Sequence, residues 1–360
     1  MQVNIQLLRF IVTMAVVLCH VADHYTAAGG TGFPLLLQYL PIAGHIGVDT
    51  FFVISGYILW VTTRNSSGPL ACAQFLYRRA TRIYFGYWPF LILVVVMYWA
   101  YSFQFGRPID IWGSIFLTQN QSQLLILPVS WTLSYEILFY ICLAVILLLP
   151  KQFRVKALII WFLLFCIAMI LLWLVFNGYL PRYNQVIMRV CSFSMSSYSL
   201  DFIGGCFLAY YLEKGLSINL IVCTLLLFIL SGIMAVYKTH GAENALLDYP
   251  YKRAAVCGIA AIMLVAISVG LEKCGKIFHP AASLLLGNAT YSIYLSHTIL
   301  LEWFYFLGWR TAAQNGAFSP GLFVVISTLI ILAYSIWHYL SIESPLTKLS
   351  QAFAKKIFKH

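Results

Sequence analysis

Residues 157–177 read ALIIWFLLFCIAMILLWLVFN, an apolar stretch that contains no charged side chain. A helix rises about 1.5 Å per residue and the hydrocarbon core of a bilayer is about 30 Å thick, so about 20 apolar residues are enough to span it. The stretch therefore predicts a transmembrane helix. Similar apolar runs recur from one end of the chain to the other, with short polar connections between them.

The overall composition also indicates a membrane protein. Of the 360 residues, 62% are hydrophobic and only 9% are charged, whereas about a quarter of the residues in a soluble domain are charged. The net charge of +11 suits attraction to anionic lipid headgroups, and nucleic acid is not needed to explain it. The nine cysteines form no CxxC pair and lie mostly in apolar runs, so we interpret them as small core residues rather than metal ligands.

The apolar runs, taken in order, predict an all-α polytopic bundle of about ten transmembrane helices. The predicted spans are 7–26, 44–62, 83–103, 129–149, 157–177, 197–212, 217–237, 254–271, 284–308 and 320–341. Basic clusters at 78–82, 151–156 and 348–359 then fall on one side, which the positive-inside rule assigns to the cytoplasm. We expect both termini in the cytoplasm, with residues 1–345 as one integral membrane domain and 346–360 as a short basic cytoplasmic tail.

Two segments leave the topology open. Residues 7–25 are followed by Ala27 and Ala28 and could also be a secretory signal, but a signal core rarely carries ionisable groups such as His20 near its end. Residues 108–127 are interrupted by an asparagine and several glutamines. We expect this second segment to lie at the outer face or to be re-entrant and line a cavity, because irregular backbone at membrane depth needs protein or water around it.

Arg9 and His20 lie eleven positions apart in the first span, which places them within about 20° of one helix face and about 16 Å apart along it. The arginine would lie at the cytoplasmic headgroups and the imidazole within the bilayer. An ionisable group inside a membrane is costly and marks function by default, although a hydrogen-bonded structural histidine is the alternative. Asp23 and His24 follow one turn later, where they could orient His20, line the outer mouth or have no functional role.

Glu136 is a second ionisable group in an apolar run, within the sequence WTLSYE that begins at Trp131. A buried carboxylate must be protonated or paired. A neutral imidazole such as that of His20 can take a proton from a hydroxyl, and a carboxylate partner would stabilise the cation that forms. The alternative is that Glu136 makes an interhelical hydrogen bond that only holds the bundle together.

The cluster of Arg78, Arg79 and Arg82 precedes the third span. It could serve topology alone, but guanidinium groups also bind phosphate oxygens in a bidentate manner. The segment GVDTFFVISGY at 47–57 contains small residues that allow helices to approach closely. It also contributes Asp49 and Ser55 as candidates for lining a site.

These patterns together resemble the membrane acyltransferases of acyltransferase family three, from Asn4 to about Pro345. The motifs that match are the arginine and histidine spaced by ten residues at Arg9 and His20, the GVxxFFVISG block at Gly47–Gly56, the RxxR pair Arg79 and Arg82, the element at Trp131–Tyr140, the late block Gly287–His297 and the closing IExP at Ile342–Pro345. The opening Asn4–Arg9 and the WTLSYE form are most similar to the exopolysaccharide-modifying acetyltransferases of that family.

The resemblance implies a multi-pass enzyme of the bacterial inner membrane. It would move an acetyl or other short acyl group from cytoplasmic acyl-CoA to a hydroxyl of an extracytoplasmic polysaccharide or lipid-linked glycan, and no metal is expected because a thioester is already activated. The implied catalytic residues are His20 and Glu136, and the residues implied near the donor are Arg9, Arg78, Arg79 and Arg82. Candidates for lining the acceptor site are Asp23, His24, Asp49, Ser55, Trp131 and His297.

Two positions depart from the family pattern. The chain has Phe85–Gly86 where relatives usually place a proline, and Asp201 stands where they more often have glutamate. The main alternative function is a transporter or flippase for a lipid-linked saccharide, which inverted repeats would favour; residues 1–177 and 178–360 show no convincing repeat. A structural subunit of a polysaccharide synthase is a further alternative, and binding of coenzyme A would discriminate among the three.

Overall fold

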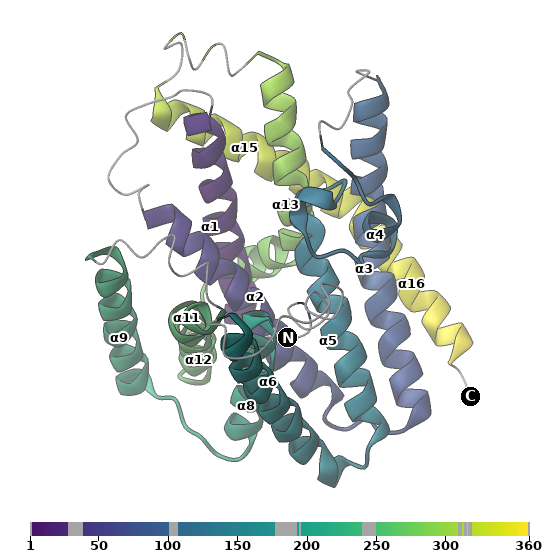
Figure 1. Ribbon diagram of the computed structural model, residues 1–360, viewed down its shortest axis with the longest axis vertical. Coiled ribbons are helices and arrows are strands. Elements are labelled where there is room, and N and C mark those ends of the chain that lie inside the picture. Colours follow the sequence, from purple (N-terminus) through teal and green to yellow (C-terminus); the bar gives the residue numbers. More distant parts are fainter. Residues whose placement is uncertain are drawn as a thin grey trace. The chain divides into compact units, whose positions relative to one another are not determined.

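A computed structural model describes residues 2–27, 39–100, 107–176, 196–239, 250–308 and 319–358, together with the single positions 193, 312 and 315. All the regular elements within these ranges are helical (Figure 1). The predicted all-α, polytopic membrane fold is confirmed. Seven helical segments are long and apolar enough to cross a membrane: Val3–Ala27, Leu40–Thr63, Pro69–Ala100, Pro128–Leu148, Lys151–Val175, Ala254–Lys273 and Gly321–Ile357.

Two of the helices continue through π-helical segments. The α-helices are α1 (Val3–Ala27), α2 (Leu40–Thr63), α3 (Pro69–Ala100), α4 (Ile111–Phe116), α5 (Trp131–Leu148), α6 (Arg154–Phe176), α8 (Ser197–Glu213), α9 (Leu220–Thr239), α11 (Pro250–Arg253), α12 (Ile259–Lys273), α13 (Pro280–Phe306), α15 (Pro320–His338) and α16 (Ser344–Ile357). The 3-10 turns are η2 (Ser122–Leu124), η3 (Pro128–Ser130) and η4 (Lys151–Phe153). The π-helical segments are η5 (Ala254–Gly258) and η6 (Tyr339–Glu343).

Three of the predicted spans form helices that are not among these seven. The span 197–212 corresponds to α8, which has 17 residues, and 217–237 corresponds to α9, whose apolar part is Leu220–Gly232. The span 284–308 corresponds to α13, which is 27 residues long but rich in hydroxyl and amide side chains. The number of spans, the cytoplasmic termini and the division at residue 345 stay predictions, and the ends of the spans 83–103 and 157–177 lie outside the described residues.

The chain divides into two compact units. The first consists of Met1–Ile5, Asp49–Leu76 and Leu138–Ile277, and the second of Gln6–Val48, Tyr77–Ile137 and Phe278–His360. The boundary falls inside helices α1, α2, α3 and α5, so each of these helices contributes residues to both units.

In the first unit, α2 and α8 cross at two glycines. A Cβ atom added to Gly56 would lie 2.0 Å from the carbonyl oxygen of Phe202, and one added to Gly205 would lie 2.0 Å from the carbonyl oxygen of Val53. Each glycine thus faces backbone of the other helix, the close approach that small residues permit. Beside this crossing, the rings of Phe139 and Phe202 stack with centroids 4.9 Å apart.

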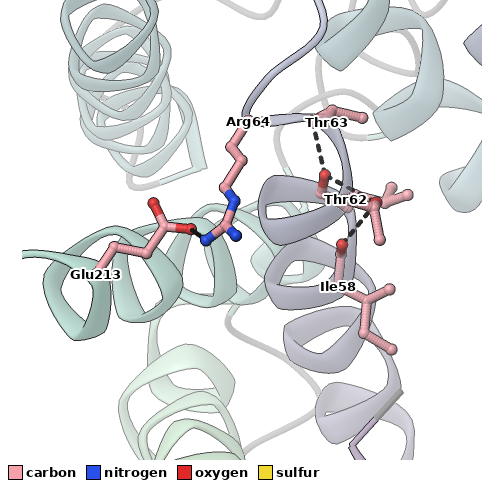
Figure 2. A network of polar contacts seen from close by, with 6 residues as sticks. Ile58, Thr62, Thr63, Arg64 and Glu213 are labelled. Carbon is pink, nitrogen blue, oxygen red and sulfur yellow. Dashed lines mark hydrogen bonds and ion pairs between the residues drawn. The ribbon is translucent and has the colours of Figure 1, made fainter.

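Polar contacts at the end of α2 also belong to the first unit. The Nη1 atom of Arg64 lies 3.1 Å from Oε1 of Glu213 (Figure 2); both side chains are exposed to solvent, where such a pair is worth about 0–1 kcal/mol. Arg154 donates to the carbonyl oxygens of Thr63 and Ser66. It thereby satisfies backbone acceptors that the helix end leaves without an intrahelical partner.

The core of the second unit lies between α1, α13 and α15. Val17 and Val21 of α1 pack with Ile293 of α13 and Phe323 of α15, all of them buried. Further toward the start of both helices, a Cβ atom on Gly287 would lie 2.5 Å from the Cβ atom of Gln6. Helix α13 therefore runs beside α1 along most of its length.

Helix α3 packs against α13 at Gly86. The hydroxyl of Tyr291 donates to the carbonyl oxygen of Ile83 over 2.9 Å, and a Cβ atom on Gly86 would lie 2.3 Å from the ring of Tyr291. Gly86 therefore leaves room for this ring. Helix α3 continues through this position and contains Pro89 in its interior.

The polar segment 108–127 packs on α3 through short helices and turns. The carboxylate of Asp110 accepts from the backbone N–H of Gly113 at the start of α4, and the hydroxyl of Tyr87 donates to the carbonyl oxygen of Ser114. The side-chain oxygen of Gln119 accepts from two successive backbone N–H groups. These side chains satisfy an irregular backbone, as the sequence led us to expect of such a segment. Its place at the outer face and its role in lining a cavity stay predictions.

We expect Gly205→Val to destabilise the protein by about 1–3 kcal/mol, because the added side chain meets backbone that cannot move aside. The free energy of unfolding can be measured from thermal or denaturant unfolding of the purified protein in detergent. The matched control is Gly232→Ala in α9, where an added Cβ meets no atom within 4 Å. Equal stability of the two variants would contradict the proposed close crossing.

Candidate functional site

His20 of α1 and His297 of α13 form a pair of imidazoles in the second unit. The Nε2 atom of His297 lies 3.0 Å from the Nδ1 atom of His20, and the ring centroids are 5.1 Å apart. His297 is fully buried, and its Nδ1 atom lies 3.3 Å from the carbonyl oxygen of Ile293. The sequence identified both histidines, but nothing in their spacing indicated that they would touch.

The hydrogen bonds of this pair select one tautomer of each ring. A carbonyl oxygen only accepts, so Nδ1 of His297 carries a proton that it donates to Ile293. In a neutral ring the Nε2 atom of His297 then has the lone pair and accepts from Nδ1–H of His20. The same argument leaves the Nε2 atom of His20 unprotonated. That nitrogen is therefore the atom that can take up a proton.

Asp23 and His24 lie near this pair, toward the end of α1. Both are close enough to His20 for electrostatic interaction, and Cys19 Sγ contacts the carboxylate of Asp23 over 3.8 Å. Asp23 is exposed, whereas His24 is half-buried. Their location at an outer mouth and their role stay predictions.

Glu136 approaches the same part of the second unit from α5. One turn before it on the same helix, Oγ1 of Thr132 donates to the hydroxyl of Tyr294 over 3.1 Å. The ring of Tyr294 is in turn 5.7 Å from that of His297, between centroids. Tyr294 therefore links the helix that carries Glu136 to the histidine pair. A direct contact of Glu136 with His20 stays a prediction.

Trp131 begins α5, just after the turn η3. Its ring packs edge-on against Tyr135, with centroids 5.7 Å apart, and the hydroxyl of Tyr135 accepts from Asn120 Nδ2 over 3.2 Å. Trp131 therefore helps to hold the irregular segment 108–127 against the start of the helix that carries Glu136. Its proposed role in lining the acceptor site stays a prediction.

The predicted donor-binding arginines come from two helices of the second unit. Arg78 and Arg82 are exposed and Arg79 is half-buried on α3, while Arg9 of α1 donates to Gln6 Oε1 over 3.1 Å. The charges of Arg9 and Arg82 both act on the carboxylate of Glu343. The structure thus adds an acidic residue to this basic cluster.

Glu343 ends the π-helical segment η6, and its carboxylate accepts a hydrogen bond from Ser292 Oγ over 2.6 Å. The same Oγ atom lies 2.9 Å from Nδ1 of His338, whose ring packs on Phe90 with centroids 4.1 Å apart. Our sequence analysis missed Ser292, His338 and Glu343. The signals that could have found them are the late block around Ser292 and the closing IExP motif.

A separate cluster of charges is buried in the first unit. Arg253 binds Asp49 through two nitrogens, with Nη2 to Oδ2 at 2.5 Å and Nε to Oδ1 at 3.3 Å. Asp201 is also buried in this cluster, and the guanidinium carbon of Arg253 lies 4.9 Å from the centre of the Tyr198 ring.

Asp49 and Ser55 were predicted to line the same site as His20. The structure places these two residues in the first unit and the other predicted site residues in the second. Asp49 is completely buried and is bound by Arg253. This ion pair links α2 to α11. A role of either residue toward the acceptor stays a prediction. Among the residues that the structure describes, no three histidine, cysteine or acidic side chains could together hold a metal ion.

Comparisons with known proteins identify the family of the chain. No solved structure matches the chain. The exopolysaccharide production protein ExoZ of Rhizobium meliloti (strain 1021) is 28% identical over 325 residues, which are 86% of this chain and 91% of that relative. The family model described as an acyltransferase domain matches residues 2–340, a range that contains His20, Glu136 and His297. The chain therefore belongs to acyltransferase family three and is a multi-pass membrane acyltransferase.

Proposed function

We propose that this acyltransferase moves an acetyl or other short acyl group from cytoplasmic acyl-CoA to a hydroxyl of an extracytoplasmic polysaccharide or lipid-linked glycan. The observation that carries the proposal is the hydrogen-bonded His20–His297 pair, which leaves the Nε2 atom of His20 able to accept a proton. The similarity to a protein whose name refers to exopolysaccharide production supports the class of acceptor. The location that we propose is the bacterial inner membrane.

The donor would bind at the arginine-rich end of the second unit. Arg79 and Arg82 lie one turn apart on α3, and Arg9 approaches the same acidic residue as Arg82. Coenzyme A carries several phosphates, and planar guanidinium groups bind phosphate oxygens through paired hydrogen bonds. The exposed positions of Arg78 and Arg82 keep these groups accessible to a donor that arrives from water.

The histidine pair would act on the acceptor. As the acceptor oxygen attacks the acyl carbonyl carbon, the Nε2 atom of His20 takes the hydroxyl proton. The bond from the acyl carbon to its carrier then breaks, and the imidazolium returns the proton to the departing atom. His297 holds the other nitrogen of the ring in place, so the accepting atom needs no reorientation. The apolar surroundings strengthen the electrostatic stabilisation of the transition state.

Binding of the donor tests the proposal against its rivals. The purified protein should bind radiolabelled acetyl-CoA saturably in equilibrium dialysis, and membranes that contain it should transfer the label to an acceptor glycan. A flippase for lipid-linked saccharides would move its substrate without acyl-CoA. Absence of both binding and transfer would exclude the proposed function, and mass spectrometry of surface polysaccharide from cells with and without the protein would identify the acceptor.

His20→Ala should lower the rate of acyl transfer by about 100- to 10,000-fold, which is the usual contribution of a positioned general base. Membrane insertion and coenzyme A affinity should be unchanged, because the donor phosphates bind elsewhere. A matched control is His279→Asn, which changes an exposed histidine at a left-handed backbone position with φ of 36°. Near-normal transfer by His20→Ala would show that His20 is not the base.

Arg79→Ala or Arg82→Ala should weaken donor binding by about 1.5–3 kcal/mol, or about 10- to 150-fold in Kd. Lysine should restore only part of the affinity because it lacks the planar fork. Arg64→Ala is the control, since Arg64 forms an exposed ion pair with Glu213 in the other unit. If these variants bound coenzyme A normally but were inserted with the wrong orientation, the cluster would serve topology alone.

His20 and Glu136 should act as one catalytic unit, because Tyr294 links the helix of Glu136 to His297, the partner of His20. The double variant His20→Ala with Glu136→Gln should then transfer acyl groups hardly more slowly than the slower single variant. The measurement is the transfer rate of all four proteins under identical conditions. Losses that multiply would instead indicate that Glu136 contributes independently.

A further inference from the structure

The hydroxyl of Ser292 is enclosed by two groups that can exchange protons with it. Its Oγ atom lies 2.6 Å from Oε2 of Glu343 and 2.9 Å from Nδ1 of His338. Ser292 is fully buried and His338 is 2% exposed. All three residues belong to the second unit, with the carboxylate and the imidazole supplied by the continuous segment α15–η6.

The direction of each hydrogen bond follows from the geometry and from the single proton of the hydroxyl. The hydroxyl of Ser292 donates to Oε2 of Glu343, and a serine hydroxyl has only one proton to donate. The Nδ1 atom of His338 must then donate to Oγ. The two partners therefore act on the serine in the same sense. Glu343 accepts its proton, and His338 donates a hydrogen bond that stabilises the negative charge that develops on the oxygen.

A base within about 2.6–3.2 Å of a hydroxyl can activate it as a nucleophile, and here His338 contacts the same oxygen from a second direction. This arrangement occurs beside a π-helical segment, a feature often found at functional sites. The next turn of α13 provides a comparison. There Ser296 Oγ lies 2.7 Å from the hydroxyl of Ser335, which in turn donates to the carbonyl oxygen of Ile331. Neither of these groups is charged.

The position of Ser292 along the bundle suits an intermediate stage of transfer. On α13, Gly287 packs against Gln6 and His297 bonds to His20. Ser292 is five positions from each of these two residues, or about 7.5 Å along the helix axis. It therefore lies between the level of the arginines and the level of the histidine pair.

We propose that Ser292 accepts the acyl group from the donor as an ester, with Glu343 as its base, before the group passes to the glycan. The inference rests on the proposed function, because it takes acyl-CoA as the donor. Ser292 Oγ forms a bond to the thioester carbonyl carbon, the carbon–sulfur bond breaks, and the serine proton passes through Glu343 to the departing thiolate. The acceptor hydroxyl then attacks the ester, the bond to Oγ breaks, and the proton that His20 removes from the acceptor returns to the serine oxygen.

A purely structural role for Ser292 would be to tie α13 to η6 by hydrogen bonds. Such a tie affects stability but forms no covalent adduct and catalyses no partial reaction. An acyl-serine, in contrast, allows the first half of the reaction to proceed without any acceptor. The two roles are therefore separated by what the protein does with acetyl-CoA alone.

The experiment uses the full-length protein, purified in detergent, with radiolabelled acetyl-CoA and no glycan. After acid quenching, mass spectrometry should find one acetyl group on the peptide that contains Ser292. In a parallel assay, labelled coenzyme A should exchange into acetyl-CoA. Ser292→Ala should lose the adduct and at least 100-fold of the exchange rate while it still binds coenzyme A, whereas Ser296→Ala should behave as the wild type.

Two conservative variants keep the test decisive if alanine disturbs folding. Ser292→Cys should take up the acetyl group as a thioester that hydroxylamine cleaves. Glu343→Gln can still bond to the serine hydroxyl but cannot take its proton, so it should slow labelling by about 100-fold or more.

The outcomes distinguish this inference from the function on which it rests. A wild-type protein that transfers acetyl groups to glycan without exchange or an adduct on Ser292 would overturn the relay and leave the proposed function intact. The same conclusion would follow if Ser292→Ala, or a folded Ser292→Cys without a thioester, kept transfer within about threefold of the wild type. A wild-type protein that neither binds acetyl-CoA nor transfers its acetyl group would overturn both.

Discussion

The rest of the structure depends on one constraint: an ionisable or strongly polar side chain inside an apolar bundle must find a partner in the protein. Removing a charge from water costs several kcal/mol unless another group compensates for it. This chain meets the constraint in three clusters that use different chemistry. His20 and His297 are hydrogen-bonded to each other, Arg253 binds Asp49 through two nitrogens, and Ser292 bridges Glu343 and His338.

Helix α13 brings most of this chemistry together in the second unit. It places His297 against α1, Tyr294 beside Thr132 of α5, Tyr291 against α3, and Ser292 and Ser296 toward α15 and η6. A helix with polar contacts on so many sides cannot be uniformly apolar. This explains why α13, despite its 27 residues, is not one of the seven described segments that are apolar enough to cross a membrane. Gly86 and Gly287 allow the close packing that these contacts require, because each faces a neighbouring side chain where a Cβ would collide.

Each of the two π-helical segments adjoins a cluster of buried polar groups, one in each unit. Segment η5 directly follows Arg253 and includes Gly258, where an added Cβ would lie 2.5 Å from Asp201. Segment η6 follows His338 and ends at Glu343. A π-helical turn alters the rotation between successive residues, so it turns a side chain away from the face that regular helical spacing would give it. In both units this local change accompanies a cluster of buried polar groups.

The sequence by itself determined the membrane class, the all-helical architecture and the family, because these follow from apolar run length and from local motifs. It also placed Arg9 and His20 on one face of α1, since their spacing is set by the period of a single helix. Only the tertiary structure decided the partners: His297 for His20 at a separation of 277 residues, Arg253 for Asp49 at 204, and Glu343 for Ser292 at 51. Helical periodicity states which way a side chain faces, but the residue it meets depends on how other helices pack against that face, and π-helical turns such as η6 break the period itself.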